Sequence, residues 1–434
     1  MANTTTAVLN SLKYAYGTNR VLYLFNQESV CFNILSRVKK PVGGRGQFIL
    51  PILTTNPGAF KGISEGGSLP TALDAATAEA TYALQEYVAV YTLTWKLIQD
   101  SRTDKFAFQQ AVQMLDEGLR RRVMRNLNAD LIDDGRGRLA VLAAADDGAG
   151  KFTATYLPRL EKGMVVDVMA NSDDDTLRGT ALTVNAVDPI ARTVTLSSAI
   201  AGESAADYCV IAGTTDISVT TTAKHSNGLL GVISNANPTS SAVVASYGGI
   251  NRSTAGNEYW KSPLLGNSGT NRPLTEDLLL QGMDSVAEKG GGQPTAWISN
   301  RPILRRYHEM LAGERYFSLS QPGAIGGGIG RKGGMDRDNA DDGGEGKTPY
   351  EFSGIPWHCD PYFQNNVVIG LDTAHFFLGV GDNEVPRPIS EIFDNVPFFK
   401  QTTSATFDVN WYYQMQLISD NPAAGVQIQD VSEA

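Results

Sequence analysis

The chain has 434 residues, of which 42% are hydrophobic and 9% aromatic, an apolar content too high for an intrinsically disordered protein. Acidic residues outnumber basic ones by 46 to 36, and the net charge of -10 argues against a dedicated nucleic-acid-binding protein, which would carry a basic excess. Three distant cysteines without Cys-x-x-Cys spacing argue against a disulfide framework and favour a reducing compartment.

The first 97 residues predict an arm followed by a long hairpin. A short helix is expected over residues 28–38, because Pro41 blocks its continuation. Strands are expected over 47–54 and 81–95, joined by a loop rich in proline and glycine. Both faces of the second strand carry apolar side chains, so it is expected to be buried. Burial against another subunit and burial as an internal strand of an ordinary sheet are equally supported.

A long helix is predicted between Asp104 and Asp133, where apolar residues recur every three or four positions. At 1.5 Å per residue this helix would be ~45 Å long. Asp104 can cap its start, and Gly135 follows its end. Its clustered arginines favour a solvated or salt-bridged face over a phosphate site, because acidic residues lie nearby. These arginines are Arg120, Arg121, Arg122 and Arg125.

The middle of the chain changes from helical to β-type patterning. Residues 156–213 hold short β-type runs, which predict a compact inserted β module. Helices are then predicted over 275–290 and 300–311, with a strand over 295–299 between them.

The last part of the chain combines a glycine-rich segment with further strands. Residues 321–348 hold 10 of the 44 glycines together with scattered charges, which is typical of a mobile surface loop. From Tyr350 onward the pattern is mainly β, and residues 406–418 alternate between apolar and polar side chains. This alternation predicts an antiparallel strand with one buried face.

No motif for catalysis or ligand binding occurs in the context that its chemistry requires. Ser64 lies in a Gly-x-Ser-x-Gly match, but the surrounding loop offers no strand-turn-helix elbow. The glycines of 323–328 and the Gly-Lys-Thr of 346–348 lack the flanking strand and helix of a nucleotide-binding loop. The four histidines show no metal-ligand spacing. We therefore expect no catalytic, cofactor-binding or metal-binding residues, and a protein that is not an enzyme.

Short motifs follow one another along most of the chain outside residues 156–213. They are Gly43-Gly-Arg-Gly-Gln-Phe48, Glu65-Gly-Gly-Ser-Leu-Pro70, Gln99-Asp100-Ser101, Asn128-Ala-Asp-Leu-Ile-Asp-Asp-Gly135, Gly137-Arg-Leu-Ala140, Tyr247-Gly-Gly-Ile-Asn-Arg252, Gly354-Ile-Pro356, Asp360 and Leu371-Asp372-Thr373. Each motif is short, but in order and spacing they resemble the major capsid proteins of tailed bacteriophages.

The resemblance implies an α+β protein with the Hong Kong 97-type capsid fold, in which a peripheral and an axial domain carry an N-terminal arm, an extended β-hairpin loop and a long spine helix. The β module would be an inserted small β-barrel-like domain. The implied divisions are the arm (1–40), the extended loop (41–97), the peripheral domain with the spine helix (98–155), the inserted β domain (156–214), the axial domain (215–349) and strands returning to both domains (350–434).

In function, the resemblance implies a virion structural protein: a major capsid protein that self-assembles into pentamers and hexamers of an icosahedral bacteriophage head enclosing double-stranded DNA. Implied partners are further copies of itself, a separate scaffold protein, a portal, a decoration protein in some heads, and DNA packaged without sequence specificity. No membrane and no cofactor are expected, and assembly would take place in the host bacterial cytoplasm. An encapsulin-like compartment shell of the same fold and another phage structural or tail protein are the alternatives.

By the same analogy, six residues are candidates for contact between subunits. They are Phe60, Lys61 and Ile63 at the expected hairpin tip, and Tyr87, Tyr91 and Trp95 on the second strand. Some members of the family cross-link a loop lysine to an asparagine of a neighbour, which makes Lys61 a candidate for such a bond. An ordinary surface lysine or a salt bridge is the favoured interpretation of Lys61, because short matches give many false positives.

Overall fold

The computed structural model describes residues 30–39, 47–55, 57–72, 74–95, 105–156, 159–171, 177–213, 225–237, 246–290, 292–318, 351–381, 386–388, 399–400 and 406–433. The expected arm before Val30, the Asp104 cap and the glycine-rich 321–348 segment lie outside these residues.

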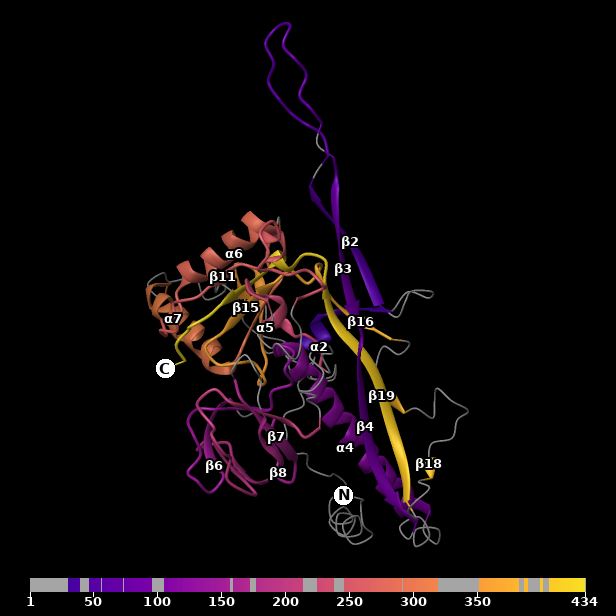
Figure 1. The fold of residues 1–434 in the computed structure, drawn as a ribbon. Helices are drawn as coiled ribbons and strands as arrows, with labels where there is room; N and C mark the ends of the chain where they lie inside the picture. Colours follow the sequence, from indigo (N-terminus) through magenta and orange to yellow (C-terminus); the bar gives the residue numbers. More distant parts are fainter. Residues whose placement is uncertain are drawn as a thin grey trace.

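A two-stranded antiparallel hairpin projects from the body of the molecule (Figure 1). Its strands are β2 (Gln47–Thr55) and β3 (Ala76–Ala83). Its base is anchored: Phe48 and Tyr82 are buried in the central core, and the Tyr82 hydroxyl donates to the Ser419 carbonyl at 2.7 Å. Leu50, Ile52 and Ala78, further along the two strands, are partly buried against the same core. A lone two-stranded ribbon is marginally stable in water, so within one chain the hairpin depends on this base.

The long strand β19 (Thr406–Ser419) organises a six-stranded sheet. β4 (Gln85–Thr94) runs antiparallel along one edge of β19, and three short strands follow one another along its other edge. The short strands are β16 (Phe376–Val380), β17 (Arg387–Pro388) and β18 (Phe399–Lys400), and β1 (Ser36–Lys39) pairs in parallel with β16.

The helix α4 (Lys105–Ile132) runs alongside β4 and β19 (Figure 1). Its 28 residues make a helix of ~42 Å, as the apolar spacing predicts. Leu115 and Leu119 pack against a cluster that contains Tyr91 and Trp411. Because side chains alternate across a strand, α4 covers one face of the β4–β19 ribbon and leaves the other face uncovered by the helix.

A closed β-barrel with strand order β10-β5-β6-β9-β8-β7 follows α4. The strands are β5 (Ala140–Leu142), β6 (Lys151–Tyr156), β7 (Val165–Met169), β8 (Leu177–Asp188), β9 (Thr193–Leu196) and β10 (Tyr208–Ile211). The inserted β module is therefore a barrel, but it begins at Ala140 and not at residue 156. β5 and β6 complete it by pairing with β10 and β9, and such distant pairing leaves no local pattern.

A second six-stranded sheet, ordered β11-β20-β15-β12-β14-β13, lies next to α6 (Glu276–Gly290) and α7 (Arg301–Ser318) (Figure 1). Thr275 and Asn300 cap these helices, as predicted, by accepting from the backbone N–H three residues on. The strands are β11 (Leu264–Leu265), β12 (Ala296–Ser299), β13 (Glu351–Phe352), β14 (Ile355–Cys359), β15 (Val368–Leu371) and β20 (Gly425–Ile428).

Aromatic side chains fill the core of this second sheet. Trp297 stacks on Trp357 with ring centroids 6.0 Å apart, and Tyr307 of α7 lies 4.8 Å from Trp357. Gly370 faces Trp297, and a Cβ there would meet the indole at 2.7 Å. The glycine therefore provides the space in which the tryptophan packs.

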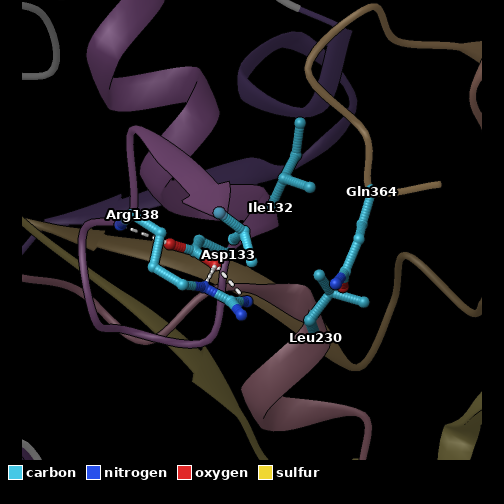
Figure 2. A pocket seen from close by; sticks show the side chains of 6 residues that line it. Ile132, Asp133, Arg138, Leu230 and Gln364 are labelled. Carbon is cyan, nitrogen blue, oxygen red and sulfur yellow. Dashed lines mark hydrogen bonds and ion pairs between the residues drawn. The ribbon is translucent and has the colours of Figure 1, made fainter. Parts of the chain in front are cut away.

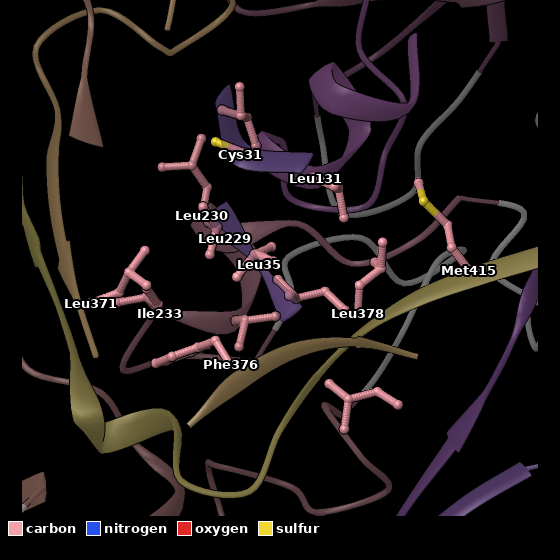
Figure 3. Packing of buried hydrophobic residues seen from close by; sticks show 14 of the residues in the cluster. Cys31, Leu35, Leu131, Leu229, Leu230, Ile233, Leu371, Phe376, Leu378 and Met415 are labelled. Carbon is pink, nitrogen blue, oxygen red and sulfur yellow. The ribbon is translucent and has the colours of Figure 1, made fainter. Parts of the chain in front are cut away.

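The central core joins the two sheets (Figure 3). The short helices α2 (Val30–Ile34) and α5 (Leu229–Val232) contribute Cys31, Leu35 and Leu229 from in and around them, and the sheets contribute Leu371 and Phe376. Two 3₁₀ turns complete the elements: η2 (Glu258–Trp260) and η5 (Pro422–Ala424).

Three expected boundaries are wrong. The helix expected over 28–38 ends at Ile34, because residues 36–39 pair with β16. The strand expected over 81–95 is divided at Leu84: β3 ends in the hairpin and β4 continues in the β19 sheet, so the hairpin is shorter than 41–97. The helix expected over 300–311 extends to Ser318.

Candidate assembly surface

The loop between β2 and β3 presents large apolar side chains to solvent. Phe60 is fully exposed, Leu69 is 82% exposed and Ile63 is about half exposed. Gly58 and Gly66 have positive φ, which lets the backbone turn at both points. Apolar side chains that gather at one exposed place are typical of a contact surface.

The exposure continues along one face of the hairpin. Ile49 and Leu53 on β2 are about half exposed, whereas Phe48, on the opposite face, is buried at the base. Alternation along the strand places the two exposed side chains together. They form, with the loop, the hairpin surface, which consists of Ile49, Leu53, Phe60, Ile63 and Leu69.

A second exposed face, which mixes apolar and polar side chains, lies on the β4–β19 ribbon, on the side away from α4. Val88 is 60% exposed and Val90 is about half exposed. Tyr412 and Asn410 of β19 stand opposite them in the sheet. These four residues are the ribbon face. Trp95, just beyond β4, is also about half exposed and stacks on Phe407 at 5.6 Å.

Tyr87 and Tyr91 occupy the other face of β4, where Tyr87 is half-buried against the central core and Tyr91 is buried. Tyr91 is 8% exposed, and burial together with the nearby Asp116 raises its pKa to about 12. The Tyr87 hydroxyl accepts a hydrogen bond from the Ser226 backbone N–H at 2.7 Å, and burial raises its pKa. Of the six residues expected at subunit contacts, Tyr87 and Tyr91 thus face the interior of their own chain, whereas Phe60, Lys61, Ile63 and Trp95 are exposed or half exposed.

No family model matches the sequence, and no curated protein matches it. Among solved structures, the fold is similar to the cyanophage A-1(L) capsid asymmetric unit, with a TM-score of 0.56 and 12% identity over 95% of this chain and 96% of that chain. This chain has the Hong Kong 97-type capsid fold. The capsid of a native GTA particle gives a TM-score of 0.46 with 11% identity over 96% of this chain and 94% of that chain. The holo-SrpI encapsulin from Synechococcus elongatus PCC 7942 gives 0.44 with 8% identity over 98% and 96%.

In this fold, buried charges gather at the C-terminal end of α4. Arg138 donates to Asp133 through its backbone N–H and its guanidinium at 2.7–2.9 Å. Burial opposes ionisation of Asp133, but the Arg138 charge outweighs it and lowers the pKa to about 2. Asp130 accepts from Arg159 at 2.9 Å and lies 3.0 Å from His225 Nδ1. The Asn128–Arg138 motifs thus encode a polar junction between the helix and the barrel.

A small pocket lies beside the Asp133–Arg138 pair (Figure 2). It is lined by Ile132, Leu230 and Gln364 as well, and its space is that of about one water molecule, too small for a substrate. Within the described stretches, no three metal-ligating side chains gather. None of the described helices is long and apolar enough to cross a membrane.

Arg252 closes the Tyr247–Arg252 motif and is a structural residue that sequence reasoning missed. Its buried guanidinium donates to four backbone carbonyls at 2.6–3.0 Å, and burial lowers its pKa to about 10. The acceptors are Gly231, Val232, Ala236 and Trp260. Three of these carbonyls lie within residues 231–236 and the fourth belongs to Trp260, so the role depends on tertiary packing, which no local spacing signals.

Proposed function

We propose that this chain is the major capsid protein of a tailed bacteriophage, and that its copies form the pentamers and hexamers of an icosahedral head enclosing double-stranded DNA. The observation that carries the proposal is the hairpin surface, an exposed apolar surface that projects from a capsid fold. Side chains as large as Phe60 and Leu69 are stabilised when a second copy covers them.

We assign the contacts between subunits to the hairpin surface, with Lys61 at its tip, and to the ribbon face with Trp95. The two surfaces lie on different parts of the same chain, so the hairpin of one copy can cover the ribbon face of the next. Such a heterologous contact forms a ring when its rotation closes, as pentamers and hexamers require.

The net negative charge of the chain supports a shell that encloses DNA without recognising its sequence. The net charge of -10 is repeated in every copy, so the shell as a whole does not attract DNA. Packaging then requires partners that drive it, and a portal and a separate scaffold protein are the partners that we propose, with assembly in the bacterial cytoplasm.

Electron microscopy and sedimentation of the purified full-length chain test the proposal. Closed icosahedral particles are the expected result, and a monodisperse monomer under native conditions contradicts it. Nuclease-resistant DNA in particles from infected cells identifies a phage head, whereas protein cargo without DNA identifies an encapsulin-like compartment.

Variants of the hairpin tip test the assigned surface. Phe60→Asp combined with Leu69→Asp places charges where apolar cover is expected, so particles should be lost while the circular dichroism of the subunit is retained. Ser68→Asp is the matched control, because Ser68 is exposed in the same loop and is already polar. If the double variant formed normal particles, the hairpin surface would not be part of the contact between subunits.

A further inference from the structure

The β-barrel has an apolar core of its own. Its buried side chains, among them Phe152, Val166 and Val184, form a cluster drawn entirely from residues 139–209. Within the described residues, the central core takes no side chain from the barrel. Figure 1 shows the barrel beside α4 as a distinct body. Two units with separate cores can move relative to each other while each keeps its internal structure.

The hydrogen bonds and ion pairs between the barrel and the remainder of the chain form a polar set. Among the described residues they include Asp130–Arg159 at 2.9 Å, Arg125–Glu161, Arg136–Asn171 at 2.7 Å and Asn365 to the Thr155 carbonyl at 3.0 Å. The Asp130–Arg159 pair is the most enclosed, with both side chains more than nine-tenths buried. A buried pair is strongly weakened by the loss of one partner, because the other charge is left without compensation.

The chain enters the barrel through residues 133–138, and residues 225–227, the next described residues after Gly213, lie against them; we call these two segments the neck. Gly137, at φ +67, faces the His225 ring, and a Cβ there would come within 2.5 Å of it. Gly135, at φ +93, lies as closely against Asn227. The pocket in Figure 2, which has space for about one water molecule, adjoins the neck. The neck is therefore not filled by continuous apolar packing.

One carboxylate connects all three parts. One oxygen of Asp130 accepts from Arg159 of the barrel, and the other lies beside His225 of the neck, while Asp130 itself belongs to α4. Among the described residues, Tyr87 of β4 and Asp133 of the next helical turn are further titratable groups near it.

We propose that Asp130 is the centre of a latch that fixes the orientation of the barrel relative to α4, and that loss of the latch frees the barrel to turn as a rigid body about the neck. Because the two cores are separate, the barrel can move as a rigid body. Because polar pairs connect the barrel to α4, these contacts can be broken. Gly135 and Gly137 mark the neck as the point about which the barrel turns. This device is independent of shell assembly and can be tested on the isolated subunit.

Hydrogen exchange on the full-length Asp130→Asn variant tests the release. The neck amides of Arg138, which donates to Asp133, and of Ser226, which donates to Tyr87, should exchange at least tenfold faster than in the parent, while amides of β7 and β10 keep their protection. Equal acceleration inside the barrel would show that the barrel is not an independent unit, and an unchanged neck would show that Asp130 is no latch. Asp277→Asn, on the exposed surface of α6, controls for the change in charge.

Spin labels test the movement directly. Ile190 on the barrel and Leu280 on α6 are exposed, so labels at Ile190→Cys and Leu280→Cys report their separation, with Cys359 replaced by serine; Cys31 and Cys209 are buried. We expect one narrow distance distribution with Asp130 present and a broader or shifted one in Asp130→Asn. Identical distributions would overturn the proposal.

A second variant keeps the test decisive if Asp130→Asn does not fold. Glu161→Gln weakens the latch at its solvent side, where the Glu161 side chain is 20% exposed and pairs with Arg125. Its neck amides should exchange faster in the same pattern as in Asp130→Asn, with β7 and β10 unchanged. Unaltered neck amides in this variant would contradict the latch.

Discussion

At the scale of single residues, the fold is stabilised by ionised groups that are buried at the end of α4. Burial raises the pKa of Asp130, but the contacts with His225 and Arg159 outweigh it and the net pKa lies below the usual value. Asp133 behaves in the same way through Arg138, with a pKa of about 2. Asp134 goes the other way, because burial raises its pKa, so it offsets part of their effect.

The lowered pKa values predict a loss of stability in acid. A carboxyl group whose pKa is lower in the folded than in the unfolded chain stabilises the fold above about pH 4. That stabilisation is lost as the pH falls from about 4 to about 2, the pKa of Asp133. The free energy of unfolding of the subunit, measured in denaturant at a series of pH values, should fall in this range. Asp133→Asn should flatten the fall, and an equally steep fall in that variant would contradict the assignment.

Arg252 offers a prediction about the loss of a buried hydrogen-bond donor. Arg252→Met keeps much of the side-chain length but removes the guanidinium donor from three buried carbonyls and from the part-buried Ala236 carbonyl. Since a hydrogen bond from a charged donor contributes ~1.5–3 kcal/mol, we expect a loss of at least ~3 kcal/mol in the free energy of unfolding. Arg305→Met, on the exposed face of α7, is the control. A loss below ~1 kcal/mol would show that water replaces the guanidinium.

At the scale of elements, the two faces of β4 have different roles. Side chains on one face stabilise the subunit, and side chains on the other are proposed to contact a neighbouring subunit. Tyr91→Ala removes a ring from the cluster with Leu119 and Trp411, so the subunit should lose ~3 kcal/mol of stability. Val88→Asp changes an exposed side chain of the ribbon face and should leave the unfolding midpoint unchanged while particle yield falls. Denaturant unfolding and sedimentation of both variants measure the two effects. If Val88→Asp assembled normally, the ribbon face would not be a contact.

The same strand shows what the sequence predicts and where it fails. Periodicity within one element is local, so α4 and β19 follow from the sequence nearly to their ends. The division at Leu84 depends on which sheet each half joins, and the start of the barrel at Ala140 depends on pairing with β10. For the surface, apolar content alone did not distinguish the buried Tyr91 from the exposed Val88, because the side that α4 covers is a tertiary property.

At the scale of the whole molecule, the separate cores predict more than one unfolding transition in the isolated subunit. The barrel cluster and the central core share no residues, and the strands of the barrel pack chiefly on one another. A chain with two such units departs from two-state behaviour unless the contact between them is strong. Here that contact is the polar latch, so calorimetry should resolve two transitions or a calorimetric enthalpy above the van't Hoff value.

Matched core variants assign the two transitions. Val166→Ala opens a cavity in the barrel core and Leu371→Ala opens one in the central core, since both side chains are fully buried. Each variant should lower one transition by several degrees and leave the other within about a degree. Asp130→Asn, by breaking the latch without touching either core, should separate the transitions further. If each core variant instead lowered both transitions together, the chain would unfold as one cooperative unit, and the barrel could not turn without the body unfolding as well.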